Sequence, residues 1–161
     1  MAKDIKLEFD SETLEGDVLL DKGDLETDEG LSTAVMISLF TDRRAEESDP
    51  YDNDDRRGWW GDQLALVEGD QIGSRLWLLN RSKATESNAN KAKEYIYEAL
   101  EWMRDDGVAS DIIIDTFIYG DSWNKRLGCE IKIYRKSGNV IAMKFDDLWN
   151  KTPIIGAINA I

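Results

Sequence analysis

Residues 85–107 read TESNANKAKEYIYEALEWMRDDG, and this stretch decides the fold class because it carries the clearest periodic pattern in the chain. Its apolar side chains recur at steps of three and four residues, at Ala89, Ala92, Tyr95, Ile96, Ala99, Leu100, Trp102 and Met103. That spacing places them on one face of a helix, away from the charged side chains. Thr85 or Ser87 can cap the start of this helix, and Gly107 suits the left-handed conformation that ends one. The stretch therefore predicts a long amphipathic helix.

Three stretches that follow this helix predict a small antiparallel sheet. Residues 112–119 are mostly apolar, and residues 129–134 alternate between apolar and polar side chains with the period of a half-buried strand. A polar turn at 135–139 leads into a third strand at 140–145. A helix that packs across such a three-stranded sheet gives an α+β fold.

Residues 31–40 predict a second, shorter helix. They are apolar on nearly every side, and a helix without a polar face is buried. Thr27 or Asp28 is expected to cap its start. Arg43 and Arg44 follow its C-terminus, where their charges would offset the negative end of the helix dipole.

The chain divides into three parts around these elements. Residues 1–27 alternate apolar and polar side chains early on and are expected to form an N-terminal β segment. Residues 28–150 form the α+β domain, which is long enough to bury one core. Residues 151–161 are an apolar C-terminal tail. The tail can close the core as a short helix or dock on a partner, and both readings stay open.

The charge of the chain restricts its partners. It has 33 acidic and 20 basic side chains and a net charge of −13, with eleven acids in residues 1–30 and eight in residues 42–62. Such a chain is repelled by phosphate backbones, so we expect no nucleic-acid binding, whereas a basic protein partner is compatible with it. No apolar run reaches the about 20 residues that span a bilayer, and no signal peptide is evident, so we expect no membrane partner and a cytoplasmic site of synthesis.

Catalytic motifs are missing from the sequence. There is no histidine and one cysteine, Cys129, so histidine-dependent triads, an internal disulfide and a Cys/His zinc site are excluded. Cys129 lies in an apolar run and is expected to be a buried side chain. The acidic stretch 49–55 does not fit a calcium loop, because the sixth position is Asp54 or Arg57 rather than glycine. We therefore predict no catalytic, cofactor or metal site.

The segment 41–62 is instead suited to recognition. It holds two arginine pairs, a tryptophan pair between glycines and a following aspartate, which we name the arginine–tryptophan set: Arg43, Arg44, Arg56, Arg57, Trp59, Trp60 and Asp62. Guanidinium forks and indole faces are used to hold another protein surface in a fixed geometry, so this set is the predicted protein interface. Two alternatives remain. The arginines can pair with the acids 52–55, and both tryptophans can pin the loop to its own core.

Three stretches together resemble the Mu-type phage baseplate wedge family: LFTDRRA at 39–45, RRGWWGD at 56–62 and IGSRLWLL at 72–79. GDL at 23–25 and WMRDDGV at 102–108 belong to the same resemblance, which covers most of the chain. This family is similar to the T4-type wedge protein that starts the sheath and to its type VI secretion counterpart. The resemblance implies a non-enzymatic subunit of a contractile tail baseplate, assembled in the host cytoplasm, that joins the wedge to the first sheath ring and helps to initiate the sheath.

The resemblance also implies partners: other baseplate wedge subunits, the tail sheath protein, and central hub or tube proteins. Sheath strands would extend the sheet at the exposed edge of the 112–145 meander, since an unpaired strand edge accepts another strand. Relatives carry a Glu-Pro-Arg motif after the long helix that contacts the wedge core bundle. Residues 105–108 read DDGV here, with no proline or arginine in register, so this contact is expected to differ.

Two other function classes are carried beside this one. Some relatives are labelled lysozyme-like, which makes a glycan hydrolase the enzymatic alternative. An acidic adaptor that binds a basic partner is the other, and its binding would weaken steeply with salt.

Overall fold

The computed structural model describes residues 31–51, 54–80 and 82–148 in full, together with the backbone of the strand residues between 4 and 28 and of Pro153–Gly156. Its main sheet has four antiparallel strands in the order β10-β9-β8-β7. Strand β7 spans Ala109–Tyr119, β8 spans Arg126–Arg135, β9 spans Val140–Phe145 and β10 spans Pro153–Gly156. The three expected strands and the α+β class are confirmed.

The fourth strand comes from the C-terminal tail. Pro153 is opposite Phe145 and Gly156 is opposite Ala142, so β10 extends the sheet beyond β9. These four residues therefore form neither a short helix nor a free tail. The rest of the tail lies outside the described residues. Strand β7 remains at the other edge of the sheet.

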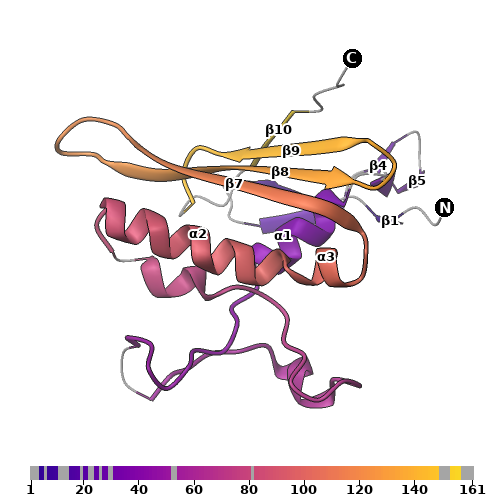
Figure 1. Cartoon of the computed structure of the whole chain (residues 1–161), viewed down its shortest axis with the longest axis horizontal. Helices are drawn as coiled ribbons and strands as arrows, with labels where there is room; N and C mark the ends of the chain where they lie inside the picture. Colours follow the sequence, from indigo (N-terminus) through magenta and orange to yellow (C-terminus); the bar gives the residue numbers. More distant parts are fainter. Residues whose placement is uncertain are drawn as a thin grey trace.

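The helices cover one face of the sheet (Figure 1). Helix α2 spans Glu86–Leu100 and packs along β7, and α3, Trp102–Asp105, continues in the same direction. Helix α1, Ser32–Phe40, and the 3₁₀ helix η2, Arg75–Leu79, both contact α2. The expected pairing of a long helix and a shorter helix with the sheet is confirmed.

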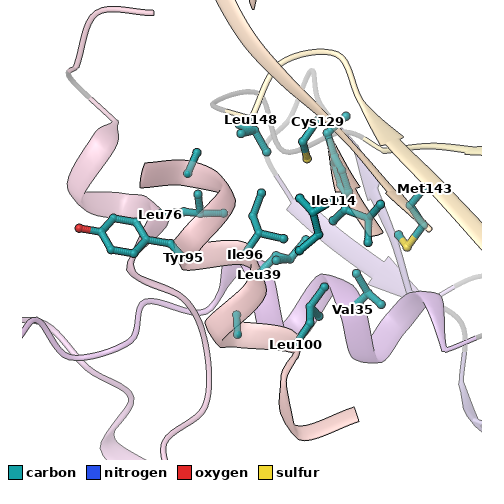
Figure 2. Packing of buried hydrophobic residues seen from close by; sticks show 14 of the residues in the cluster. Val35, Leu39, Leu76, Tyr95, Ile96, Leu100, Ile114, Cys129, Met143 and Leu148 are labelled. Carbon is teal, nitrogen blue, oxygen red and sulfur yellow. The ribbon is translucent and has the colours of Figure 1, made fainter. Parts of the chain in front are cut away.

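One apolar core joins these layers. Figure 2 shows Ile96 and Leu100 of α2 pointing toward Ile114 of β7 and Leu39 of α1. Alternate residues of β8 point into the same layer because successive side chains on a strand face opposite sides. The cluster contains the following fully buried side chains: Val35, Leu39, Ile96, Leu100, Met103, Leu127, Cys129, Ile131, Ile133, Met143 and Phe145. The Phe145 ring meets Phe40 edge to face, with 5.4 Å between the ring centroids.

The ends of α2 follow the sequence. The Thr85 side chain accepts a hydrogen bond from the Asn88 amide at 3.3 Å, which satisfies one of the free donors of the first turn. After α3, Gly107 has a φ of 71°, a conformation that costs glycine little. The predicted capping residue and the predicted terminator are both confirmed.

The start of α1 differs from the prediction. Thr27 and Asp28 do not cap it, because they form strand β6, Thr27–Asp28, which pairs with β1, Asp4–Ile5. The helix begins at Ser32 after Leu31, whose φ is 68° and whose side chain makes no capping bond. Arg43 and Arg44 do not lie in its last turn, because the chain becomes extended at Thr41, with a ψ of 135°. The predicted offset of the helix dipole is therefore wrong.

Helix α1 is buried on one side only. It buries Thr33, Val35, Ser38 and Leu39, whereas Ile37 is exposed. The hydroxyl of Ser38 accepts a hydrogen bond from the Trp102 indole at 3.2 Å, so a polar residue occupies the contact with α3. An apolar residue thus faces solvent where the sequence suggested a fully buried helix.

The N-terminal segment contains the expected strands. Beside β1 and β6, β2 (Leu7–Asp10) pairs with β3 (Glu15–Val18), and β4 (Leu20–Asp21) pairs with β5 (Asp24–Leu25). All three pairings are antiparallel. The boundaries 1–27, 28–150 and 151–161 stay predictions.

Replacing Phe145 by alanine tests whether the sheet depends on its contact with the helices. Phe145 is fully buried, so Phe145→Ala should lower the free energy of unfolding by roughly 3–5 kcal/mol. Ile113→Ala, at an exposed position of β7, should cost less than about 1 kcal/mol. Urea unfolding followed by circular dichroism measures both values. Equal losses would show that burial of this face does not stabilise the fold.

Candidate functional site

A long loop between α1 and η2 carries most of the candidate residues. It lies on the side of α2 remote from the sheet and contains a 3₁₀ helix, η1, Trp60–Leu64 (Figure 1). Its two ends are joined at the base, because the Arg43 amide donates to the Ser74 carbonyl at 3.0 Å and the Ser74 amide donates to the Thr41 carbonyl at 2.9 Å. A Cβ atom on Gly73 would lie 2.3 Å from the Thr41 carbonyl oxygen, so only glycine allows this approach. The loop is therefore closed like an Ω-loop.

Arg75 fastens the loop to helix α2. One guanidinium nitrogen lies 3.0 Å from a carboxylate oxygen of Asp49 in the loop, and another lies 2.9 Å from a carboxylate oxygen of Glu98 in α2. The guanidinium also lies 4.8 Å from the centre of the Tyr95 ring. Asp49 and Glu98 therefore share the positive charge of Arg75. This charge is shielded from solvent, because only 15% of the Arg75 side chain is exposed.

The pKa values around Arg75 follow from this arrangement. Burial alone would lower the pKa of Arg75, but the hydrogen bonds to Asp49 and Glu98 outweigh it and raise the pKa above its usual value. The pKa of Tyr95 is raised, first by burial and then by the negative charge of Asp49. Arg75 is therefore charged at neutral pH. It lies inside the 72–79 stretch, but no local sequence signal distinguishes it from an ordinary surface arginine.

The four arginines of the arginine–tryptophan set bind within the chain. Arg56 donates from Nε to the Ala45 carbonyl at 2.8 Å. Arg57 pairs with Asp42 at 2.7 Å and stacks 4.4 Å from the centre of a Trp77 ring. The sequence offered the acids 52–55 as partners for the arginine side chains, but Asp42 instead accepts the Arg57 side chain.

The other two arginines continue this pattern. Arg43 pairs with Glu98 at 3.6 Å and donates to Gln71 at 3.3 Å. Arg44 is exposed and donates to the Arg57 carbonyl at 3.3 Å. Together the four guanidinium groups link the two limbs of the loop to each other and to α2.

The two tryptophans differ from the arginines, because both face solvent. Trp59 is 43% exposed and Trp60 is 71% exposed, and their ring centroids lie 5.4 Å apart. The alternative that both tryptophans pin the loop to its own core does not apply, since neither indole is buried in the core. The Trp59 ring covers Gly61 so closely that a Cβ atom there would lie 2.1 Å from it. Glycine at position 61 thus lets the first indole approach the backbone closely.

Asp62 completes the set. One carboxylate oxygen accepts a hydrogen bond from the Ile72 amide at 3.1 Å, which ties η1 to the returning limb of the loop. The other oxygen is buried and has no hydrogen-bond partner within the described part of the chain. The structure brings Trp59, Trp60 and Asp62 together with Arg43 around one groove, whereas Arg44, Arg56 and Arg57 lie away from its lining.

The groove is an open hollow of about 920 Å³ between the loop and helices α1, α2 and α3. The indole of Trp102 forms part of its wall and is held by the hydrogen bond to Ser38. This hollow was not foreseen, because its walls come from segments that are about 60 residues apart in the sequence. It is large enough to receive several side chains of a partner.

The described residues contain one free cysteine, Cys129, which is buried. No cluster of three or more histidine, cysteine, aspartate or glutamate side chains suited to a metal ion is found among them. Burial raises the pKa of Cys129 to about 12, so its thiol is protonated in the folded core, as expected for a structural side chain. Among the same residues, no helix has both the length and the apolar character needed to span a bilayer.

Comparison with known proteins adds the family. A family model described as Phage protein GP46 matches residues 31–140. The chain is 44% identical over 137 residues to the baseplate protein gp46 of Escherichia phage Mu, covering 84% of this chain and 90% of that protein. It is 42% identical over 98 residues to the Mu-like prophage FluMu protein gp46 of Haemophilus influenzae, covering 61% of this chain and 65% of that protein. The resemblance to Mu-type baseplate proteins is thereby confirmed.

Removing the charge of Arg75 should release the loop from α2. Arg75→Met keeps an unbranched apolar side chain but leaves Asp49 without its counter-charge and Glu98 with Arg43 alone, so the free energy of unfolding should fall by roughly 1–3 kcal/mol, less than for a fully buried pair. Limited proteolysis should cut residues 45–72 faster. Arg104→Met, at an exposed position that contacts Tyr97, is the matched control and should change stability by less than about 0.5 kcal/mol. An unchanged cleavage rate in Arg75→Met would contradict the anchoring role.

Proposed function

The chain belongs to the Phage protein GP46 family, and from this membership we propose that it is a structural, non-enzymatic subunit of a contractile phage tail baseplate. The name of the Mu relative, a baseplate protein, is the observation that carries the proposal. The extent of the match supports it as well, because the alignment spans 84% of this chain and 90% of that protein. The virion tail baseplate is accordingly the proposed location, with assembly in the host cytoplasm.

Within the baseplate, we propose that the chain is a wedge subunit that joins the wedge complex to the first sheath ring and helps to initiate the sheath. The edge of β7 supports this role, because no described strand pairs with it on its outer side. An open strand edge can be extended by a strand of another protein through backbone hydrogen bonds. Tail sheath protein is the proposed donor of that strand, and other wedge subunits and central hub or tube proteins are the remaining proposed partners.

The arginine–tryptophan set is the proposed interface with other baseplate subunits. Its members have different tasks. The arginines hold the loop, since each has a partner within the chain. The tryptophans make the contact, since they are exposed on the surface of this loop. Exposed indoles on a rigid support are typical of the few residues that carry most of the energy of a protein interface.

Replacing both indoles tests this interface. The double variant Trp59→Ala, Trp60→Ala should keep a melting temperature within about 3 °C of the parent chain, because exposed side chains contribute little to folding. It should nevertheless fail to support tail assembly in a phage or prophage whose own copy is deleted, scored by negative-stain electron microscopy and by infectivity.

The matched control is Trp123→Ala, at a 98% exposed position in the turn between β7 and β8. This variant should restore normal tails. Contractile tails assembled with the Trp59, Trp60 double variant would contradict the assignment of the interface to these two residues.

A further inference from the structure

The groove gathers the exposed apolar side chains of the described residues. Nine large hydrophobic side chains are exposed, and five of them line this one hollow: Ile37, Trp59, Trp60, Leu64 and Trp102. Apolar side chains scattered singly over a surface need no explanation, but a contiguous group around a concave surface marks a binding site. The group therefore points to an occupant with an apolar face.

The charges around the groove are almost all negative. Six carboxylates and one guanidinium line it: Asp62, Asp70, Glu98, Glu101, Asp105, Asp106 and Arg43. Arg43 and Glu98 pair with each other, so their charges offset one another. Within the described part of the chain, the four exposed acids at positions 70, 101, 105 and 106 have no ion pair. An occupant therefore has to supply positive charge next to its apolar side chains.

We propose that this groove binds a cationic amphipathic segment of another protein, one whose apolar side chains enter the hollow while its lysines or arginines meet the acidic rim. The inference rests on the proposed function, since it names the chemistry of a partner at the same surface. Grooves of this kind bind the apolar face of a helix through residues spaced three and four apart.

Other occupants fit the charges less well. A second copy of this chain would bring a net charge of −13 to an acidic rim. The chain's own first 30 residues carry eleven acids against three bases, and residues 151–161 carry a single lysine. Neither segment supplies the positive charge that the rim requires.

The walls of the groove are already in place without a partner. Trp102 is fixed by Ser38, and Asp62 is fixed to the backbone of Ile72. Gly73 lets the base of the loop close against Thr41. A preformed site avoids much of the ordering cost of binding, so a short segment can bind without a large interface.

Binding of synthetic peptides to the full chain tests the inference. The probe is an 18-residue helical peptide of leucine and lysine with leucine on one face. Its binding is measured by isothermal titration calorimetry. The folded chain should bind it at least about tenfold more tightly than a scrambled peptide of the same composition, and a leucine–glutamate peptide should not bind. Equal binding of the first two peptides would overturn the proposal, because it would reflect net charge alone.

Two pairs of variants locate the binding. The double variant Glu101→Lys, Asp105→Lys reverses two charges of the rim and should weaken binding about tenfold or more. The double variant Glu94→Lys, Asp121→Lys changes the net charge equally at exposed positions outside the groove. Its effect on binding should be smaller, within about threefold. Equal weakening by both pairs would overturn the proposal.

The apolar contact has its own matched pair in the same loop. Leu64 lines the groove and is 72% exposed, whereas Leu66 does not line it and is 103% exposed. Leu64→Gln should weaken binding about fivefold or more and Leu66→Gln should leave it unchanged. The opposite order would place the peptide elsewhere.

Failure of the groove inference and failure of the proposed function can be told apart. If purified tails lack this chain, the baseplate role fails but the peptide measurements stand. If the tails contain the chain and it does not distinguish the peptides, the groove inference alone fails.

Discussion

The ion pairs of Arg75 with Asp49 and Glu98 are the constraint on which the functional surface depends. They connect the loop to the rear of helix α2, while the large apolar side chains of the loop itself, Trp59, Trp60, Leu64, Leu66 and Val67, stay exposed. Without such an anchor, a loop of this length and charge would not hold a fixed shape. The pairs are shielded from solvent and the cation lies against the Tyr95 ring, so they are worth more than exposed ion pairs of the same length. The anchor holds the limb of the loop that contains Asp49, and its other carboxylate, Glu98, also lines the groove.

The core of the fold could be predicted from the sequence because its signals are local. The stripe of apolar residues on α2, its cap at Thr85 and the alternation in β8 each follow from side chains a few residues apart. The start of α1 could not be predicted in this way, because the pairing of β6 with β1 is a long-range contact that overrides local capping preference. The fourth strand forms by pairing of residues 153–156 with β9, the strand that precedes it in the sequence.

The candidate site was predicted in part. The residue types in segment 41–62 indicated a recognition surface, but they did not separate the arginines from the tryptophans. The arginines bind the chain's own carbonyl and carboxylate groups, whereas the tryptophans face solvent. A guanidinium group with partners inside the fold stabilises a shape, and an indole without burial offers contact area. Arg75 and Trp102 were assigned no functional role because their significance lies in distant neighbours. The groove thus follows from tertiary structure, and its acidic rim explains why so acidic a chain would suit a basic partner.

The central claim is that the loop and groove face another protein in the assembled tail. A cryo-electron microscopy reconstruction of the distal end of the tail tests it most directly, because it shows which surfaces of each subunit are covered. The account predicts that Trp59, Trp60 and the groove are buried against a neighbouring subunit, with β7 extended by a strand of another chain. Density for this chain with the groove open to solvent on every copy would contradict it.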